Sequence, residues 1–130
     1  MKIKPETILF EKKIKTESGI YFISGNDETY ISKISDLLIS KFKDDGYSDI
    51  INNHSGVLDA DGNNIGDVSL FFDKKIVVYK NPKKVEVSDL DALNYEKTRF
   101  IILDNNTKSS SKIKKYFDTH PVFLSITCYK

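Results

Sequence analysis

The stretch Gly19-Ile-Tyr-Phe-Ile-Ser-Gly-Asn-Asp-Glu28 decides the fold class of this chain. The apolar run from Ile20 to Ser24 is typical of a buried strand, and Gly25 then allows a tight turn. Asn26 or Asp27 can cap a helix that follows, because short polar side chains accept hydrogen bonds from the first helical N–H groups. The stretch therefore predicts a strand that turns through glycine into a helix, where a nucleotide-binding α/β domain would have its phosphate loop.

The segment Gly25-Asn-Asp-Glu28 lacks the chemistry of a working phosphate loop. No second glycine and no Gly-Lys-Ser/Thr sequence precede the helix, so the lysine and the magnesium-binding hydroxyl are missing. Asp27 and Glu28 place carboxylates in the first helical turn, where they would repel a phosphate. We interpret Gly25, Asn26, Asp27 and Glu28 as a degenerate phosphate-loop position, and we expect no bound nucleotide and no catalytic residue there.

Downstream of this stretch, the sequence alternates between helical and strand patterns. Ile31, Ile34, Leu38 and Phe42 recur at helical spacing and predict one buried helix face that ends at Asp45-Gly46. Further strands are expected at 49–52, 75–80, 99–104 and 122–128, and further helices from residue 5 to before residue 18, at 88–93 and at 109–118. This alternation predicts a three-layer αβα domain with a parallel sheet of about five strands.

Length and composition fit a single domain over residues 1–130, either a minimal protein or the N-terminal piece of a longer one. Lysine and arginine total 20 against 19 acidic residues, for a net charge of +1, which argues against binding nucleic acid through bulk charge. No apolar run approaches the ~20 residues that span a bilayer, and no signal peptide is evident, so we expect a cytoplasmic protein without a membrane partner. The single cysteine, Cys128, is expected to be a small buried hydrophobe.

Two features that could hold a metal favour structural roles instead. Asp104 follows an apolar strand, but without a phosphate loop it is best interpreted as a turn or cap residue. The segment Asp59-Ala-Asp-Gly-Asn63 begins like a calcium loop, yet its sixth position is Asn64 and its twelfth is Leu70, where that loop requires Gly and a bidentate Glu. We therefore expect no metal and no cofactor.

The segment Ser69-Leu-Phe-Phe72 places three large apolar residues together just before the strand that begins near Lys75. If all three were on the surface, they would form a patch of the kind that marks a protein contact. Alternatively, they fold back over the sheet as part of the core. The residues alone leave both interpretations open.

The combination of Tyr21-Phe-Ile-Ser-Gly-Asn-Asp27 with Ser69-Leu-Phe71, a charged pair and the strand Ile76-Val-Val78 resembles the delta subunit of the bacterial DNA polymerase III clamp loader. The likeness is to the N-terminal domain of that family and spans nearly the whole chain, including Phe100-Ile-Ile-Leu-Asp104 and Ile126-Thr-Cys128. It implies an ATPase-like fold of the AAA+ type that has lost nucleotide binding. The chain would then be no enzyme by itself, although the holoenzyme that contains this family is a DNA-directed DNA polymerase.

The resemblance also implies a role in DNA replication. Domains of this family bind the ring-shaped sliding clamp and favour its open form, so that the ring can be loaded onto primed DNA. A Leu-Phe pair just before the third strand inserts into the clamp, and the matching positions are Leu70 and Phe71, with Ser69 before them and Phe72 as a further contact or a core residue. The implied partners are the clamp and, in a longer chain, other clamp-loader subunits, with DNA contacted only indirectly.

The sequence departs from the family in two respects. Gly56, Gly62 and Gly66 make the helix before the Leu-Phe pair short or irregular, and the family's second and collar domains are absent from these 130 residues. Two other functions stay open: a divergent nucleotide-dependent phosphotransferase or ATPase, and a nucleic-acid-binding module. The second would use four lysines expected to point outward from the helix at 109–118, opposite Ile113, Tyr116 and Phe117. These lysines are Lys108, Lys112, Lys114 and Lys115.

Overall fold

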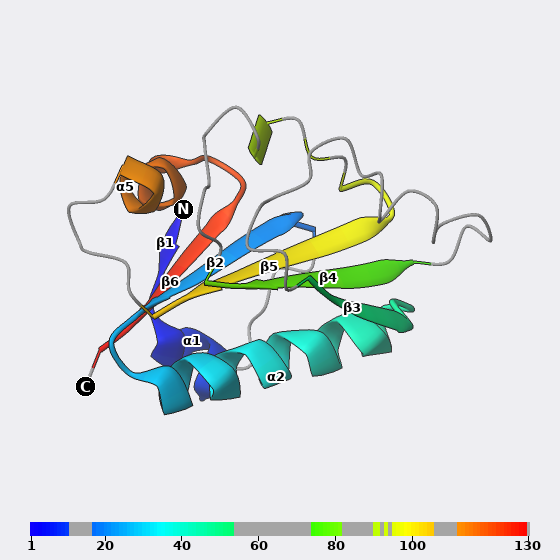
Figure 1. Ribbon diagram of the computed structural model, residues 1–130, viewed down its shortest axis with the longest axis horizontal. Coiled ribbons are helices and arrows are strands. Elements are labelled where there is room, and N and C mark those ends of the chain that lie inside the picture. The colour runs from blue at the N-terminus through cyan, green and yellow to red at the C-terminus, as the bar shows by residue number, and fades with distance from the viewer. Residues whose placement is uncertain are drawn as a thin grey trace.

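The computed structural model shows one parallel sheet with helices on both of its faces (Figure 1). It describes residues 1–10, 17–53, 74–81, 90–91, 93, 95–105 and 112–129. In chain order the elements are β1 (Lys2–Ile3), α1 (Pro5–Leu9), β2 (Ile20–Gly25), α2 (Glu28–Asp44), β3 (Asp49–Asn53), β4 (Lys75–Lys80), β5 (Thr98–Asp104), α5 (Lys112–Thr119) and β6 (Leu124–Cys128). The predicted α/β class with a parallel sheet is confirmed.

The sheet has the strand order β1-β6-β2-β5-β4-β3, and all of its pairs are parallel. β2 lies between β5 and β6, so that Ile23 is opposite both Leu103 and Ile126. Within the described residues the sheet has six strands, where the sequence predicts about five. The additional strand is β1, which pairs with β6. It has only two residues, which are too few to show the alternating pattern by which a strand is predicted from sequence.

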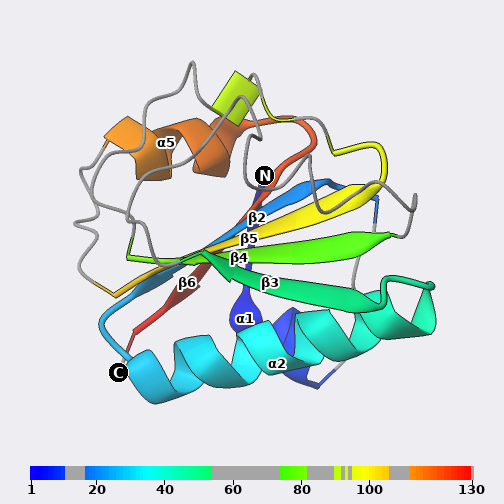
Figure 2. The same ribbon diagram turned by 45° about the vertical axis from the view of Figure 1, so that its right-hand side comes forward.

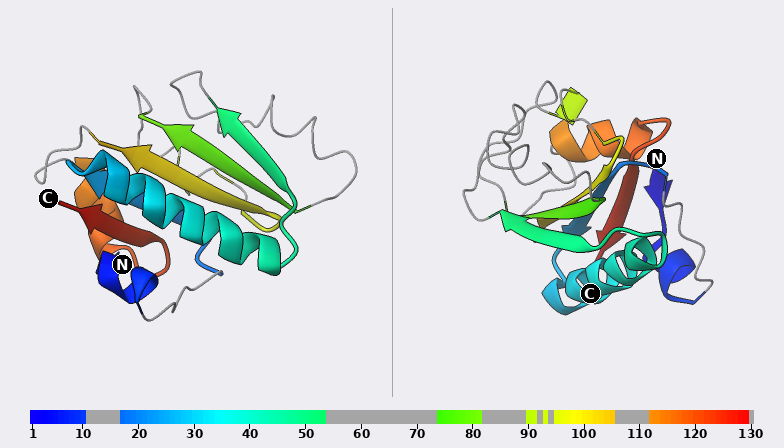
Figure 3. Two further views of the ribbon diagram at one scale, coloured as in Figure 1. Left: turned by 90° about the horizontal axis from the view of Figure 1, so that it is seen from below. Right: turned by 90° about the vertical axis from the view of Figure 1, so that its right-hand side faces the viewer.

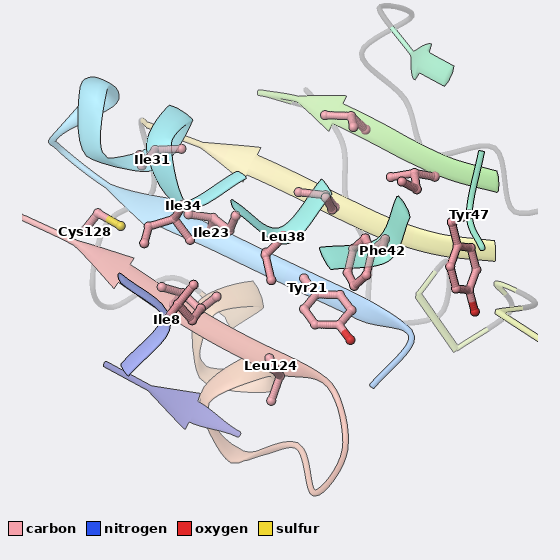
Figure 4. Packing of buried hydrophobic residues seen from close by; sticks show 14 residues of the cluster. Ile8, Tyr21, Ile23, Ile31, Ile34, Leu38, Phe42, Tyr47, Leu124 and Cys128 are labelled. Atoms are coloured by element: carbon pink, nitrogen blue, oxygen red, sulfur yellow. The ribbon is translucent and has the colours of Figure 1, made fainter. Parts of the chain in front are cut away.

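Three layers result, because α1 and α2 cover one face of the sheet and α5 covers the other (Figures 2 and 3). On the α2 face, the predicted helix residues Ile31, Ile34, Leu38 and Phe42 are buried against strand residues such as Tyr21 (Figure 4). A second apolar cluster fills the α5 face. Each face of the interior strands is thus covered, as their continuous apolar runs require.

α5 corrects one prediction about its lysines. Lys114 was expected to point outward, but it is only 4% exposed and its Nζ lies 2.7 Å from Asp118 Oδ2. Burial raises the pKa of Asp118, but hydrogen bonds from Lys114 and Ser125 outweigh it, so the pKa is lowered overall. Lys112 and Lys115 are exposed as predicted. Lys108 lies outside the described residues.

Two element ends differ from the prediction. α1 ends at Leu9, well before Ser18. Residues 109–111 of the helix predicted at 109–118 lie outside the described residues, and α5 is described from Lys112. β6 begins at Leu124 because the Nδ1 atom of His120 accepts the N–H groups of Val122 and Phe123, at 3.0 and 2.9 Å. These two hydrogen bonds stabilise a turn, so the two N–H groups do not take part in the hydrogen bonds between strands. Of the helix expected at 88–93, residues 88, 89 and 92 lie outside the described residues.

Protonation of His120 should weaken the fold. Nδ1 accepts two hydrogen bonds only when it carries no proton, and burial lowers the pKa of His120 below its ordinary 6.5. We expect the free energy of unfolding to be at its full value above pH 6.5 and to decline as the pH falls toward the lowered pKa of the folded state. Urea unfolding between about pH 5 and 8 measures this. The stability of His120→Gln should lack this pH-dependent contribution. If both proteins showed the same pH dependence, His120 would not be its source.

Candidate functional site at the carboxyl edge of the sheet

The carboxyl ends of β2, β5 and β6 lie side by side at one edge of the sheet. After β2 the chain enters α2 on one face, and after β5 it continues to α5 on the other face (Figure 1). Ligands of open α/β sheets bind at such a switch point, outside the carboxyl ends of the strands. Gly25 to Glu28, interpreted from the sequence as a degenerate phosphate-loop position, lie here.

The loop after β2 is closed on the end of β6. The backbone N–H groups of Asn26 and Asp27 both donate to the carbonyl oxygen of Cys128, at 3.1 and 3.2 Å. Gly25 has a φ of +133°, and a Cβ there would lie 1.9 Å from the same oxygen. Only glycine allows this approach. The N–H groups of Asn26 and Asp27, which a phosphate loop would offer to an anion, are therefore bonded within the protein.

The start of α2 is capped by its own acidic residues. Asp27 Oδ1 accepts a hydrogen bond from the N–H group of Tyr30 at 3.1 Å, and Glu28 lies in the first turn of α2. These carboxylates, together with the Cys128 carbonyl, oppose the binding of an anion at this helix end. The cap predicted at Asn26 or Asp27 is therefore provided by Asp27.

Removing the Asp27 side chain should destabilise the fold through α2. In Asp27→Ala the N–H group of Tyr30 loses its acceptor, so the free energy of unfolding should fall by about 1 kcal/mol. Asp27→Asn is the matched control, since it keeps a capping oxygen but removes the charge, and it should stay close to the parent. Urea unfolding at neutral pH separates the two. An equal loss in both variants would indicate that charge, and not capping, stabilises this end.

Cys128 matches its predicted structural role. Its side chain is fully buried, and burial raises the pKa of the thiol to about 12. A thiol of this kind is no nucleophile near neutral pH, because the thiolate is the reactive form. The residue contributes to the site through its carbonyl oxygen, a contact that no side-chain pattern could predict.

Sequence reasoning missed Asn81, which joins the carboxyl ends of β4 and β5. Asn81 has a φ of 49°, and its Oδ1 accepts the N–H group of Asn105 at 3.0 Å. The available signal was its place directly after a strand, because Asn adopts left-handed turn conformations more readily than most residues. Asp104, interpreted as a turn residue, ends β5 opposite Ser24 of β2.

The predicted clamp-binding residues Ser69, Leu70, Phe71 and Phe72 lie outside the described residues. Their exposure therefore stays a prediction. β4 does begin at Lys75, as predicted. The segment thus leads directly into an interior strand, flanked by β3 and β5.

Neither a metal centre nor a membrane span is found in the described part of the chain. No three His, Cys, Asp or Glu side chains gather there in an arrangement that could hold a metal ion. No helix in those same ranges has the length and apolar character needed to cross a bilayer. No family model matches the sequence, and no curated protein matches it.

Proposed function

We propose that this chain is a cytoplasmic DNA replication domain that binds the sliding clamp and favours its opening, without binding nucleotide itself. The sequence resemblance to the clamp-loader delta subunit supports the partner, and the parallel three-layer fold agrees with the ATPase-like architecture that the resemblance implies. We propose AAA+ type as the finer fold assignment. Assembly with other clamp-loader subunits would require a longer chain.

The closed loop after β2 is the observation that carries this proposal. In a nucleotide-binding α/β domain, the backbone N–H groups at this turn hold phosphate. Here the N–H groups of Asn26 and Asp27 donate hydrogen bonds to the Cys128 carbonyl oxygen instead. A nucleotide fold that is closed in this way suits a binding role better than a catalytic one.

The proposed mechanism requires only differential affinity. A protein that binds the open ring more tightly than the closed ring shifts the equilibrium toward opening, by the ratio of the two affinities. Leu70 and Phe71 would be the anchor. Burying two such side chains in a partner contributes roughly 1.5–3 kcal/mol each before the cost of association.

Replacing both anchor residues should abolish tight binding to the clamp. From the burial of the two side chains, Leu70→Ala with Phe71→Ala should raise the Kd for a bacterial β-type clamp by about 100-fold or more. Surface plasmon resonance with immobilised clamp measures the change. Phe10→Ala, which truncates a phenylalanine that is 74% exposed and is not part of the segment 69–72, is the control and should bind normally. An unchanged affinity in the double variant would remove Leu70 and Phe71 as the anchor.

Two direct measurements decide between this proposal and its rivals. Magnesium-dependent binding of ATP or GTP, detected by calorimetry, would support the phosphotransferase or ATPase alternative. DNA binding that weakens steeply with added salt would support the nucleic-acid alternative. The burial of Lys114 against Asp118 removes one of the four lysines on which that last function was based.

A further inference from the structure

A hollow of about 200 Å³ lies between α2 and the sheet, and its lining does not include Gly25 to Glu28. One wall is formed by α2, and the other by residues near the carboxyl ends of β3, β4 and β5. Its volume is below the roughly 300–1,000 Å³ of pockets for drug-sized molecules. Its position near the strand ends is nevertheless where parallel α/β sheets place their ligands.

Part of the lining of the hollow is apolar. Ile39 of α2, Val78 of β4 and Leu103 of β5 line it. Val78 belongs to the core cluster on this face, while Ile39 and Leu103 pack against that cluster and are partly buried. The three side chains are contributed by three different elements that the core holds in place. They offer a preformed contact for a small aliphatic group.

Opposite charges line the same hollow. Asp36 stands on α2 and Lys80 at the end of β4, and both side chains are exposed. Asp36 and Lys80 do not form an ion pair with each other in the described part of the chain. Asn52 of β3 adds an amide to the lining. One acidic and one basic residue thus line the same small space from different elements.

We propose that this hollow binds a small zwitterion of the α-amino-acid class with an aliphatic side chain. The ammonium group of the ligand contacts Asp36, its carboxylate contacts Lys80, and its side chain lies on Ile39, Val78 and Leu103. A ligand with a single charge would complement only one of the two protein charges, and the small volume favours a small molecule. The proposal is independent of clamp binding, because it uses none of the residues from Ser69 to Phe72.

Titrations of the full chain with three related ligands, followed by NMR, test the proposal. L-Leucine should cause saturable shifts of the methyl signals of Ile39, Val78 and Leu103, with a Kd on the order of 1 mM for so small a ligand. N-acetylleucine lacks the ammonium group, and leucine methyl ester lacks the carboxylate. Each should bind about tenfold more weakly, because each loses a charge-assisted contact.

Two variants assign the charges to the ligand groups. Asp36→Asn should weaken leucine about tenfold and remove its advantage over N-acetylleucine, while Lys80→Gln should remove its advantage over the methyl ester. Asp44→Asn and Lys33→Gln change exposed charges of α2 that do not line the hollow, and they should bind leucine as the parent does. Absence of saturable shifts with leucine, or equal binding of all three ligands, would overturn the proposal.

Discussion

Gly25→Ala should leave the chain unable to fold stably. The new Cβ would lie 1.9 Å from the oxygen and 2.6 Å from the carbon of the Cys128 carbonyl, at a φ of +133° that side chains rarely adopt. Relief requires β2 to move away from β6, which breaks the hydrogen bonds from Asn26 and Asp27 as well. We expect a loss of more than about 4 kcal/mol, which is a large fraction of the roughly 5–15 kcal/mol that stabilises an ordinary domain.

Circular dichroism with thermal and urea unfolding measures this loss, and Gly46→Ala is the matched control. Gly46 also has a positive φ, of +97°, but the nearest atom to its Cβ would be 3.9 Å away on the Lys74 side chain. The control should therefore lose only about 1 kcal/mol, from backbone strain. If both variants were equally stable, the contact between Gly25 and Cys128 would not be the reason for glycine at this position.

Phe117→Ala should detach α5 from the sheet. The Phe117 ring is fully buried and stacks on Phe22, with centroids 4.8 Å apart and planes 6° from parallel. It also lies 6.4 Å from the ring of Phe123, which precedes β6. Truncation removes these contacts and leaves a cavity, so the free energy of unfolding should fall by about 3–5 kcal/mol.

Denaturant unfolding of Phe117→Ala beside Phe10→Ala isolates the effect of burial. The chemical change is the same, but Phe10 is 74% exposed, and its truncation should shift stability by no more than about 0.5 kcal/mol. The two midpoints should therefore differ widely. Coinciding midpoints would show that the Phe117 ring does not anchor α5.

The parts of the fold that the sequence predicts are those with a strong local pattern. The helical spacing of Ile31 to Phe42 identified the buried face of α2, and the apolar run at 75–80 gave the bounds of β4. A cap at Asn26 or Asp27 was expected because short polar side chains before a helix accept hydrogen bonds from its first N–H groups, and Asp27 provides it. In each case, neighbouring residues contain the information that determines the structure.

The predictions that failed depend on residues distant in sequence or on the backbone itself. β1 exists only because β6 pairs with it. Lys114 is buried because Asp118 neutralises it, and the spacing of four residues between them was the available clue. The bond from the loop to the Cys128 carbonyl involves main-chain atoms, which every residue type has, so no sequence pattern predicts it. The hollow beside Asp36 and Lys80 likewise depends on how α2 crosses the sheet.

The central position of β2 has a consequence for how the protein is made. Ile20 pairs opposite Phe100, and Tyr21 opposite Leu124, so this early strand takes both of its neighbours from the last third of the chain. A nascent chain on the ribosome cannot complete the sheet until β6 has emerged. Such distant pairings also slow folding. During synthesis β2 therefore lacks both of its partner strands until the last third of the chain has been made, and we expect chaperones to shield it in that period.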